Sequence, residues 1–156
     1  DICIARTMPN TAIRIRQSMT CIATNKPDSK QFEEVVDIFN MLGKTLVIDE
    51  ELMLSATALG SCGIAYFLRA IRAASQGGTQ IGFHAGEAEL IAAQTAKGAA
   101  ELLLQLHSHP EDEIDKVTTP RGITIEGLNE MEHNGFSSAM IKGIVRSYDK
   151  AANKDE

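Results

Sequence analysis

The hydrophobic pattern divides the chain into two regions. The first 49 residues contain short β-rich runs and one amphipathic helix, expected at 2–5, 19–23 and 45–48 for the strands and 29–42 for the helix. The apolar face of that helix carries Phe32, Val35, Val36 and Phe39. From residue 50 onward, the apolar positions recur at helical spacing. We therefore predict the end of an alternating α/β layer over 1–49 and a mostly helical domain over 50–156.

Four helices are predicted in the second region: about 50–76, about 85–106, 123–133, and one from 137 to near the C-terminus. Gly77 and Gly78 are expected to end the first helix, and the second is expected to end before Pro110. Asn134-Gly135 is a typical helix C-cap, and Ser137 is expected to cap the last helix.

Small residues are frequent in the first two of these helices: Ala56, Ala58, Gly60, Ser61, Gly63, Ala65, Ala88, Ala92, Ala93, Ala99 and Ala100. Such residues allow helices to cross closely. A region without tryptophan and with few aromatic residues buries limited apolar area by itself. We therefore expect these helices to pair with a second copy of the chain, as a homodimer or a larger assembly of dimers.

Composition excludes some classes of function. With 15 Lys and Arg against 21 Asp and Glu, the net charge of -6 favours neither nucleic acid nor an anionic membrane as a partner. No apolar run is expected to approach the length of a bilayer span, and the N-terminus lacks the order of a signal peptide, so a cytoplasmic protein is expected. The thiols of Cys3, Cys21 and Cys62 are interpreted as reduced core residues. His107 and His109 are interpreted as a solvated helix end, and no metal is expected.

The glycine spacing argues against a complete cofactor domain. The dinucleotide-binding fingerprint needs two glycines two positions apart after an early strand, and no two glycines in this chain have that spacing. We therefore expect the 156 residues to be part of a larger protein, and by themselves to be inactive and to bind no nicotinamide dinucleotide tightly.

Three stretches carry candidate chemistry: RTMPNT at 6–11, LGSCGIAY at 59–66 and VTTPRGIT at 117–124. Taken alone, the first is typical of a turn in which Pro9 fixes φ and Asn10 caps. The second either bends a helix or permits close backbone contact. The third feeds a helix N-terminus that is suited either to a carboxylate or to simple capping.

In this order, the three stretches resemble the R-x-M-P-N-T-P, L-S-G-S-G-P-A-Y and V-[TS]-S-P-G-G-[TA]-T motifs of the pyrroline-5-carboxylate reductase family. The resemblance covers essentially the whole chain. It implies a Rossmann-like α/β domain, of which residues 1–49 are the C-terminal remnant. It also implies that residues 50–156 are the all-helical, interlocking dimerisation and substrate-binding domain.

The resemblance further implies hydride transfer from NADP(H) or NAD(H) to the C=N carbon of Δ1-pyrroline-5-carboxylate, which gives L-proline. Thr124 would hydrogen-bond the substrate ring and is the implied catalytic residue. The other residues implied to bind the substrate are Glu50, Thr119, Gly122 and Ile123. The residues implied to approach the nicotinamide are Met8, Pro9 and Asn10.

Departures from the family motifs leave the substrate open, notably Cys62, Ile64 and Arg121. Arg121 adds a cation for a substrate carboxylate or faces solvent, and the sequence does not separate these interpretations. One alternative is a reductase of a related cyclic imine such as piperideine carboxylate. A second alternative is a dimerisation module without catalytic activity.

Overall fold

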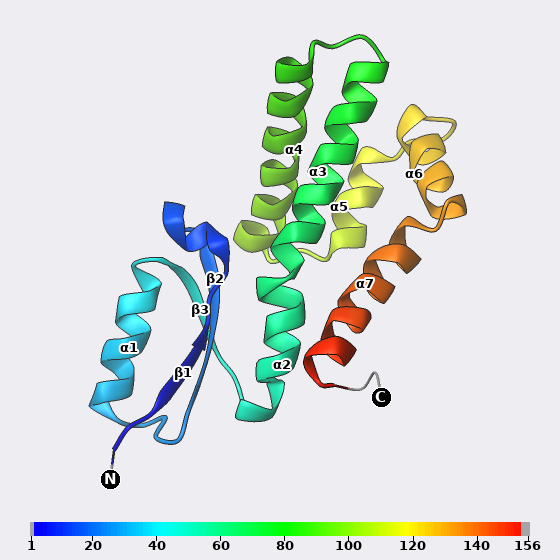
Figure 1. The fold of residues 1–156 in the computed structure, drawn as a ribbon. Coiled ribbons are helices and arrows are strands. Elements are labelled where there is room, and N and C mark those ends of the chain that lie inside the picture. The colour runs from blue at the N-terminus through cyan, green and yellow to red at the C-terminus, as the bar shows by residue number, and fades with distance from the viewer. Residues whose placement is uncertain (1, 154–156) are drawn as a thin grey trace. The chain divides into compact units, whose positions relative to one another are not determined.

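The structure, a computed structural model, describes residues 2–153 and divides into two compact units. The first unit contains the residues up to Tyr66 together with those from Met140 onward, and the second is Phe67–Ala139. Figure 1 shows the elements of both units: a small sheet with one helix in the N-terminal part, and helices in the rest of the described chain. The expected fold class, mostly helical with a small α/β portion, is confirmed. The predicted domain boundary after residue 49 stays a prediction.

The first unit is built on a three-stranded sheet in the order β1-β2-β3, with bounds Ala5–Met8, Ser18–Thr24 and Gly43–Val47. β1 pairs antiparallel with β2, and β2 pairs parallel with β3 through the crossover helix α1 (Lys30–Asn40). Ser29 caps α1, because its side chain accepts a hydrogen bond from the Phe32 amide at 3.2 Å. Phe32 lies on the apolar face of α1 and is buried, as the amphipathic pattern predicts.

The middle strand β2 forms the core of this unit. Successive strand residues point to opposite faces, and both Ile22 and Ala23 are almost completely buried, so both faces of β2 are covered. Figure 1 shows α1 and α2 on opposite sides of the sheet. Burial also raises the pKa of the Cys21 thiol. Cys3 and Cys62 are only half-buried, so the core interpretation holds for Cys21 alone.

A nearly continuous helical run follows the sheet: η2 (Glu50–Leu52), α2 (Met53–Ala56), the π-helical segment η3 (Thr57–Ser61) and α3 (Gly63–Gln80). Met53 and Ala58 are buried within the first unit. The last helix, α7 (Phe136–Ala151), contributes its C-terminal part to the same unit. The hydroxyl of Tyr66 in α3 donates to the Gly143 carbonyl of α7 at 3.3 Å and is also hydrogen-bonded to the Ser147 hydroxyl.

The second unit consists of helices: the rest of α3, then α4 (Ala85–Leu106), α5 (Pro110–Val117) and α6 (Ile123–His133). α3 continues through Gly77-Gly78 to Gln80, so the predicted helix end at these glycines is wrong. A Cβ added to Gly78 would lie 3.0 Å from the Cβ of Ala88 in α4, which is tighter than normal contact. The close approach of α3 and α4 therefore uses the absence of a side chain at Gly78.

Other element boundaries also differ from the prediction. The first strand is at Ala5–Met8 rather than 2–5, because Asn25 and Thr24 bond the Ile4 backbone with their side chains and end the ladder there. Helix α5 was not predicted. Ser137 lies inside the first turn of α7 and donates to Glu132 at 2.6 Å instead of capping. Gly135, with φ of +77°, ends α6 as expected, and its carbonyl accepts from Ala139.

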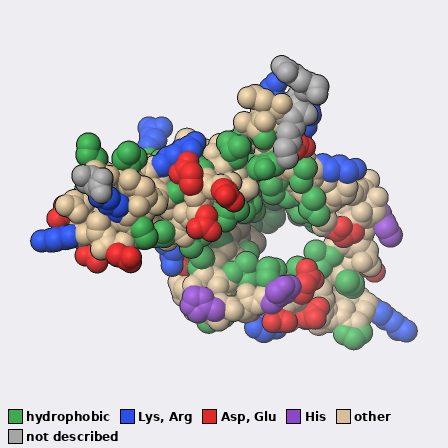
Figure 2. Space-filling view, turned by 90° about the horizontal axis from the view of Figure 1, so that it is seen from below, with side chains coloured by type: hydrophobic (Ala, Val, Ile, Leu, Met, Phe, Trp, Pro, Cys, Tyr) green, Lys and Arg blue, Asp and Glu red, His purple; other side chains and the backbone are tan. Residues whose placement is uncertain are grey.

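Large apolar side chains remain exposed along the helices, and Figure 2 shows them at the surface. Phe67 is 60% exposed, Leu90 is 70% exposed and Ile123 is 90% exposed. The helical run Glu50–Gln80 is long and apolar enough to cross a membrane by length and composition alone. The expectation that no such run exists was wrong, because the serines, threonines and glycines between the apolar residues of this run do not interrupt the helix. Composition alone does not separate a membrane span from a helix that packs against protein.

We predict that Gly43→Ala lowers the free energy of unfolding by more than about 2 kcal/mol. Gly43 has φ of +147°, and a Cβ there would overlap the backbone of Ser18, its partner in the parallel ladder. The matched control is Gly127→Ala, because a Cβ at Gly127 in α6 meets no atom within 4 Å. The control should raise stability by about 0.5–1 kcal/mol. Urea unfolding measures both, and equal stabilities of the two variants would contradict the prediction.

Candidate functional site

The first motif ends β1 and starts the 3₁₀ helix η1 (Thr11–Ile15). Asn10 caps η1, since its side-chain oxygen accepts from the Ala12 amide at 3.1 Å, which confirms the capping role expected for it. The Asn10 amide N–H donates to the Ser18 hydroxyl at 3.1 Å. Its side-chain Nδ2 donates to the carbonyl of Gly60 at 3.2 Å. Asn10 therefore joins the end of β1, the start of β2 and the helical run.

The second motif contains the π-helical segment η3. The Cys62 amide donates to the Thr57 carbonyl, five residues earlier, at 2.9 Å. Gly60 thus lies in a bulge of the helix, where carbonyls are diverted from the regular i→i+4 pattern. A Cβ added at Gly60 would meet no atom within 4 Å, so its glycine is not required by packing inside this chain.

Glu50 begins the helical run, and its carboxylate forms an ion pair with the guanidinium of Arg6 in β1. Both side chains are more than half exposed, at 55% for Arg6 and 60% for Glu50. The predicted cofactor residues Met8, Pro9 and Asn10 and the predicted substrate residue Glu50 therefore lie in one unit. The Arg6–Glu50 ion pair and the Asn10–Gly60 hydrogen bond join β1 and the loop after it to the helical run.

The third motif is a turn between α5 and α6 in the second unit. Thr118 ends α5 by donating from its hydroxyl to the Asp115 carbonyl at 3.1 Å. The Gly122 amide then donates to the Thr119 carbonyl at 2.8 Å, which closes a β-turn with Pro120 and Arg121 at its centre. Arg121 has φ of +59°, the left-handed conformation that the third residue of a type II turn requires.

Gly122 is required by sterics, because a Cβ there would collide with the side chain and carbonyl of Thr119. Gly122 is also the N-cap residue of α6, and no side chain caps this helix start. The amides of the first turn are therefore not taken by a capping side chain. Ile123 and Thr124 are exposed at this end of the helix. The turn presents backbone N–H groups, a helix dipole and a hydroxyl, which together suit a carboxylate.

The structure thus gathers the predicted site residues into two groups, each within its own unit. Met8, Pro9, Asn10 and Glu50 belong to the first unit, and Thr119, Gly122, Ile123 and Thr124 belong to the second. Sequence reasoning missed Arg6 as the partner of Glu50, because the two residues are 44 positions apart and only the position of β1 beside η2 brings them together.

Of the four histidines, His107 and His109 have structural roles at helix ends. His107 follows α4 with φ of +54°, and the ring of His109 accepts from the Glu111 amide at 3.2 Å, which caps α5. Within the range 2–153, no group of three His, Cys, Asp or Glu side chains is arranged to hold a metal ion. In α5, the hydrogen bond that Lys116 donates to Glu113 lowers the pKa of the Glu113 carboxyl.

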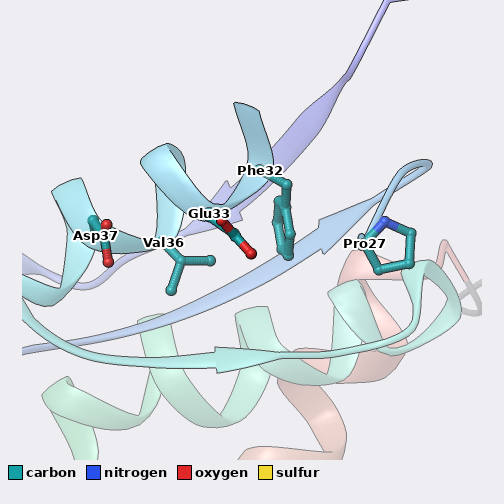
Figure 3. Close-up of a pocket in the computed structure, with 5 residues that line it drawn as sticks. All are labelled: Pro27, Phe32, Glu33, Val36 and Asp37. Carbon is teal, nitrogen blue, oxygen red and sulfur yellow. The ribbon is translucent and has the colours of Figure 1, made fainter. Parts of the chain in front are cut away.

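A pocket of about 340 Å³ lies beside α1, and none of the predicted site residues lines it (Figure 3). Its lining residues are Pro27, Phe32, Glu33, Val36 and Asp37. The two carboxylates and the apolar side chains form an open surface without a converging set of hydrogen-bond donors. The motifs, rather than this pocket, therefore define the candidate site.

The described chain has a small sheet with one helix, followed by a helical region that begins near residue 50. A family model described as pyrroline-5-carboxylate reductase dimerisation matches residues 50–154. The chain belongs to this family.

Two curated relatives come from Dictyostelium discoideum. Pyrroline-5-carboxylate reductase 1 is 61% identical over 98% of this chain, which corresponds to 30% of the relative. Pyrroline-5-carboxylate reductase 2 is 54% identical over 96% of this chain, which corresponds to 54% of the relative. The chain thus spans about half or less of the length of these relatives.

Solved structures show the same fold. The pyrroline-5-carboxylate reductase of Coxiella burnetii superposes with a TM-score of 0.90 at 26% identity, covering 99% of this chain and 58% of that one. The pyrroline carboxylate reductase of Plasmodium falciparum, solved with NADP bound, gives a TM-score of 0.88 at 28% identity, covering 97% of this chain and 58% of that one.

We predict that Asn10→Asp lowers the free energy of unfolding by about 1–3 kcal/mol. The aspartate keeps the acceptor for the Ala12 amide but loses the donor to Gly60 and places a negative charge against that carbonyl. Asn129→Asp, at an exposed position in α6, is the matched control. Thermal unfolding at neutral pH compares the two. Equal melting temperatures would show that the bond to Gly60 contributes nothing.

We predict that Arg121→Gly raises the free energy of unfolding by about 0.5–1 kcal/mol, because glycine adopts the left-handed conformation without the cost that an L side chain incurs. Arg121→Ala removes the same guanidinium but keeps the backbone strain, so it should leave stability unchanged. Denaturant unfolding of both variants decides the matter. An alanine variant as stable as the glycine variant would exclude backbone strain as the cause.

Proposed function

We propose that the intact protein containing these residues reduces Δ1-pyrroline-5-carboxylate to L-proline with NADPH or NADH. The reduced nicotinamide supplies a hydride to the C=N carbon. The ring nitrogen, protonated in the reactive imine, becomes the secondary amine, and the nicotinamide is left oxidised. The observation that carries the proposal is the uncapped start of α6 beside Thr124, on a chain whose helical part belongs to the reductase dimerisation family.

We assign recognition of the substrate carboxylate to the turn of the second unit. The backbone around Gly122, Ile123 and Thr124 offers N–H groups at the positive end of the helix dipole. Thr119 covers Gly122 and keeps the turn closed. The hydroxyl of the exposed residue Thr124 is suited to hydrogen-bond the substrate ring. Thr124 is therefore the catalytic residue that we propose. Positioning and charge stabilisation then supply the catalysis.

We assign two roles to the first unit. Glu50 supplies a negative charge that suits a protonated imine. Met8 and Pro9 are half-buried and offer apolar surface for the nicotinamide end of NADP(H) or NAD(H). The polar groups of Asn10 are engaged with Ala12, Ser18 and Gly60, so its contribution is to hold this loop in place. The dinucleotide phosphates require a glycine-rich loop of a kind that this sequence does not contain.

A second copy of the chain is the partner that we propose for the exposed helices. Phe67, Leu68 and Leu90 are each at least 58% exposed, more apolar surface than an isolated helical domain normally keeps in water. Added Cβ atoms at Gly77, Gly86 and Gly98 would meet no atom within 4 Å of this chain, so these positions leave room for a helix of another chain. We therefore propose that the apolar Glu50–Gln80 run packs against protein rather than membrane. We also propose that the enzyme is cytoplasmic and binds no nucleic acid.

A related ring imine, such as piperideine carboxylate, is the second candidate substrate. Arg121 and Ile64 are the residues that would reshape the pocket for it, because the family motifs have glycine and proline at these two positions. Comparing kcat/KM for the five- and six-membered rings in one enzyme preparation separates the two candidates.

We predict that Thr124→Val in the intact enzyme lowers kcat/KM for pyrroline-5-carboxylate by roughly 10- to 150-fold and leaves the affinity for NADPH nearly unchanged. A hydrogen bond to a charged or charge-developing group contributes about 1.5–3 kcal/mol, and valine preserves the side-chain shape. Steady-state kinetics and NADPH titration measure the two quantities.

The melting temperature of the same preparation is the control for Thr124→Val. If Thr124 only stabilised the start of α6, the variant would melt earlier while its kcat/KM per folded enzyme stayed intact. That outcome would remove Thr124 from the site.

We predict that the protein is a dimer or a larger assembly of dimers at micromolar concentration, because the exposed helices need a partner surface. Light scattering coupled to size exclusion gives the mass directly. A monomer that retains its helical circular dichroism would contradict the proposed partner.

A further inference from the structure

We propose that Arg6 is a positioning residue for the reduction, holding the carboxylate of Glu50 in the orientation that the protonated imine requires. This inference rests on the proposed function, because the role of Glu50 toward the substrate is part of that proposal. Arg6 itself is assigned no contact with substrate or cofactor.

The ion pair joins two elements that are far apart in sequence. Arg6 lies in β1, opposite Ala23 of β2, so the sheet fixes its backbone. Glu50 is the first residue of the helical run and is joined to Arg6 through the guanidinium nitrogen. A guanidinium is planar and rigid, and it restricts a carboxylate better than a flexible ammonium does.

A second bond fixes the same two elements further along. Asn10 follows β1 and donates to the carbonyl of Gly60, in the π-helical segment of the same helical run. The helical run therefore cannot turn relative to the loop that contains Met8 and Pro9 without breaking one of the two links. The position of the Glu50 carboxylate is thus set relative to the residues proposed to face the nicotinamide.

Stability does not account for the Arg6–Glu50 pair. Both side chains are more than half exposed, and exposed ion pairs contribute little to folding because solvent screens them and both side chains lose freedom. A Glu side chain has three rotatable bonds, and without a partner an exposed one samples many orientations. The pair therefore orders a carboxylate rather than stabilising the fold.

The test is a double-mutant cycle in the intact enzyme with Arg6→Gln, Glu50→Gln and the double variant. If Arg6 acts through Glu50, each single variant lowers kcat/KM for pyrroline-5-carboxylate, and the double variant is no worse than Glu50→Gln. Coupled contacts of this kind differ from additivity by at least about twofold. Arg6→Lys should recover part of the loss. The KM for NADPH and the melting temperature of Arg6→Gln should match the wild type.

The control is Lys44→Gln, which removes an exposed cation from β3 of the same sheet and should leave kcat/KM unchanged. Losses that multiply in the double variant, or an Arg6→Gln variant with wild-type kinetics, would overturn the role of Arg6. A wild-type enzyme that does not reduce the imine would instead overturn the proposed function, so the two failures are distinguishable.

Discussion

The carboxamide of Asn10 is the interaction on which the arrangement of the first unit depends. The side-chain oxygen accepts from the Ala12 amide at the start of η1, and the side-chain nitrogen donates to the Gly60 carbonyl in the π-helical segment. The backbone N–H of Asn10 donates to the Ser18 hydroxyl. The Ser18 hydroxyl is in turn hydrogen-bonded to the Thr20 hydroxyl inside the buried β2 strand, at 3.1 Å. One residue, through its side chain and its backbone N–H, therefore connects the loop after β1, the core strand and the helical run. Removing any of these bonds would leave a partly buried polar group without a partner.

Local signals predicted those elements whose ends are defined by nearby residues. Helix α4 and helix α6 match their predicted bounds, since Pro110 and Gly135 mark their limits in the sequence. Helix α5 carried readable signals that were missed: a proline at its first turn, His109 before it and three acidic residues at its start. Gly77-Gly78 misled the prediction, because the cost of glycine in a helix interior, about 1 kcal/mol, is offset by the close approach of α4.

The candidate site was predictable only where chemistry is local. The capping role of Asn10 follows from its place after Pro9, and the need for Gly122 follows from the turn around it. The Arg6–Glu50 pair and the Asn10–Gly60 bond depend on how β1 lies beside the helical run, which no local pattern encodes. The same holds for the apolar run Glu50–Gln80, whose composition fits a membrane or a partner helix equally. The matching family model is described as a dimerisation domain, which is why we propose a partner helix for this run.

The central claim is that these residues form the substrate-handling part of a proline-forming reductase, and the product is its most direct test. The intact protein is incubated with NADPH and Δ1-pyrroline-5-carboxylate, and the amino acid formed is separated on a chiral column and compared with the NADPH consumed. We predict L-proline in a one-to-one ratio with oxidised cofactor. A folded, dimeric protein that leaves both NADPH and the imine unchanged would contradict it.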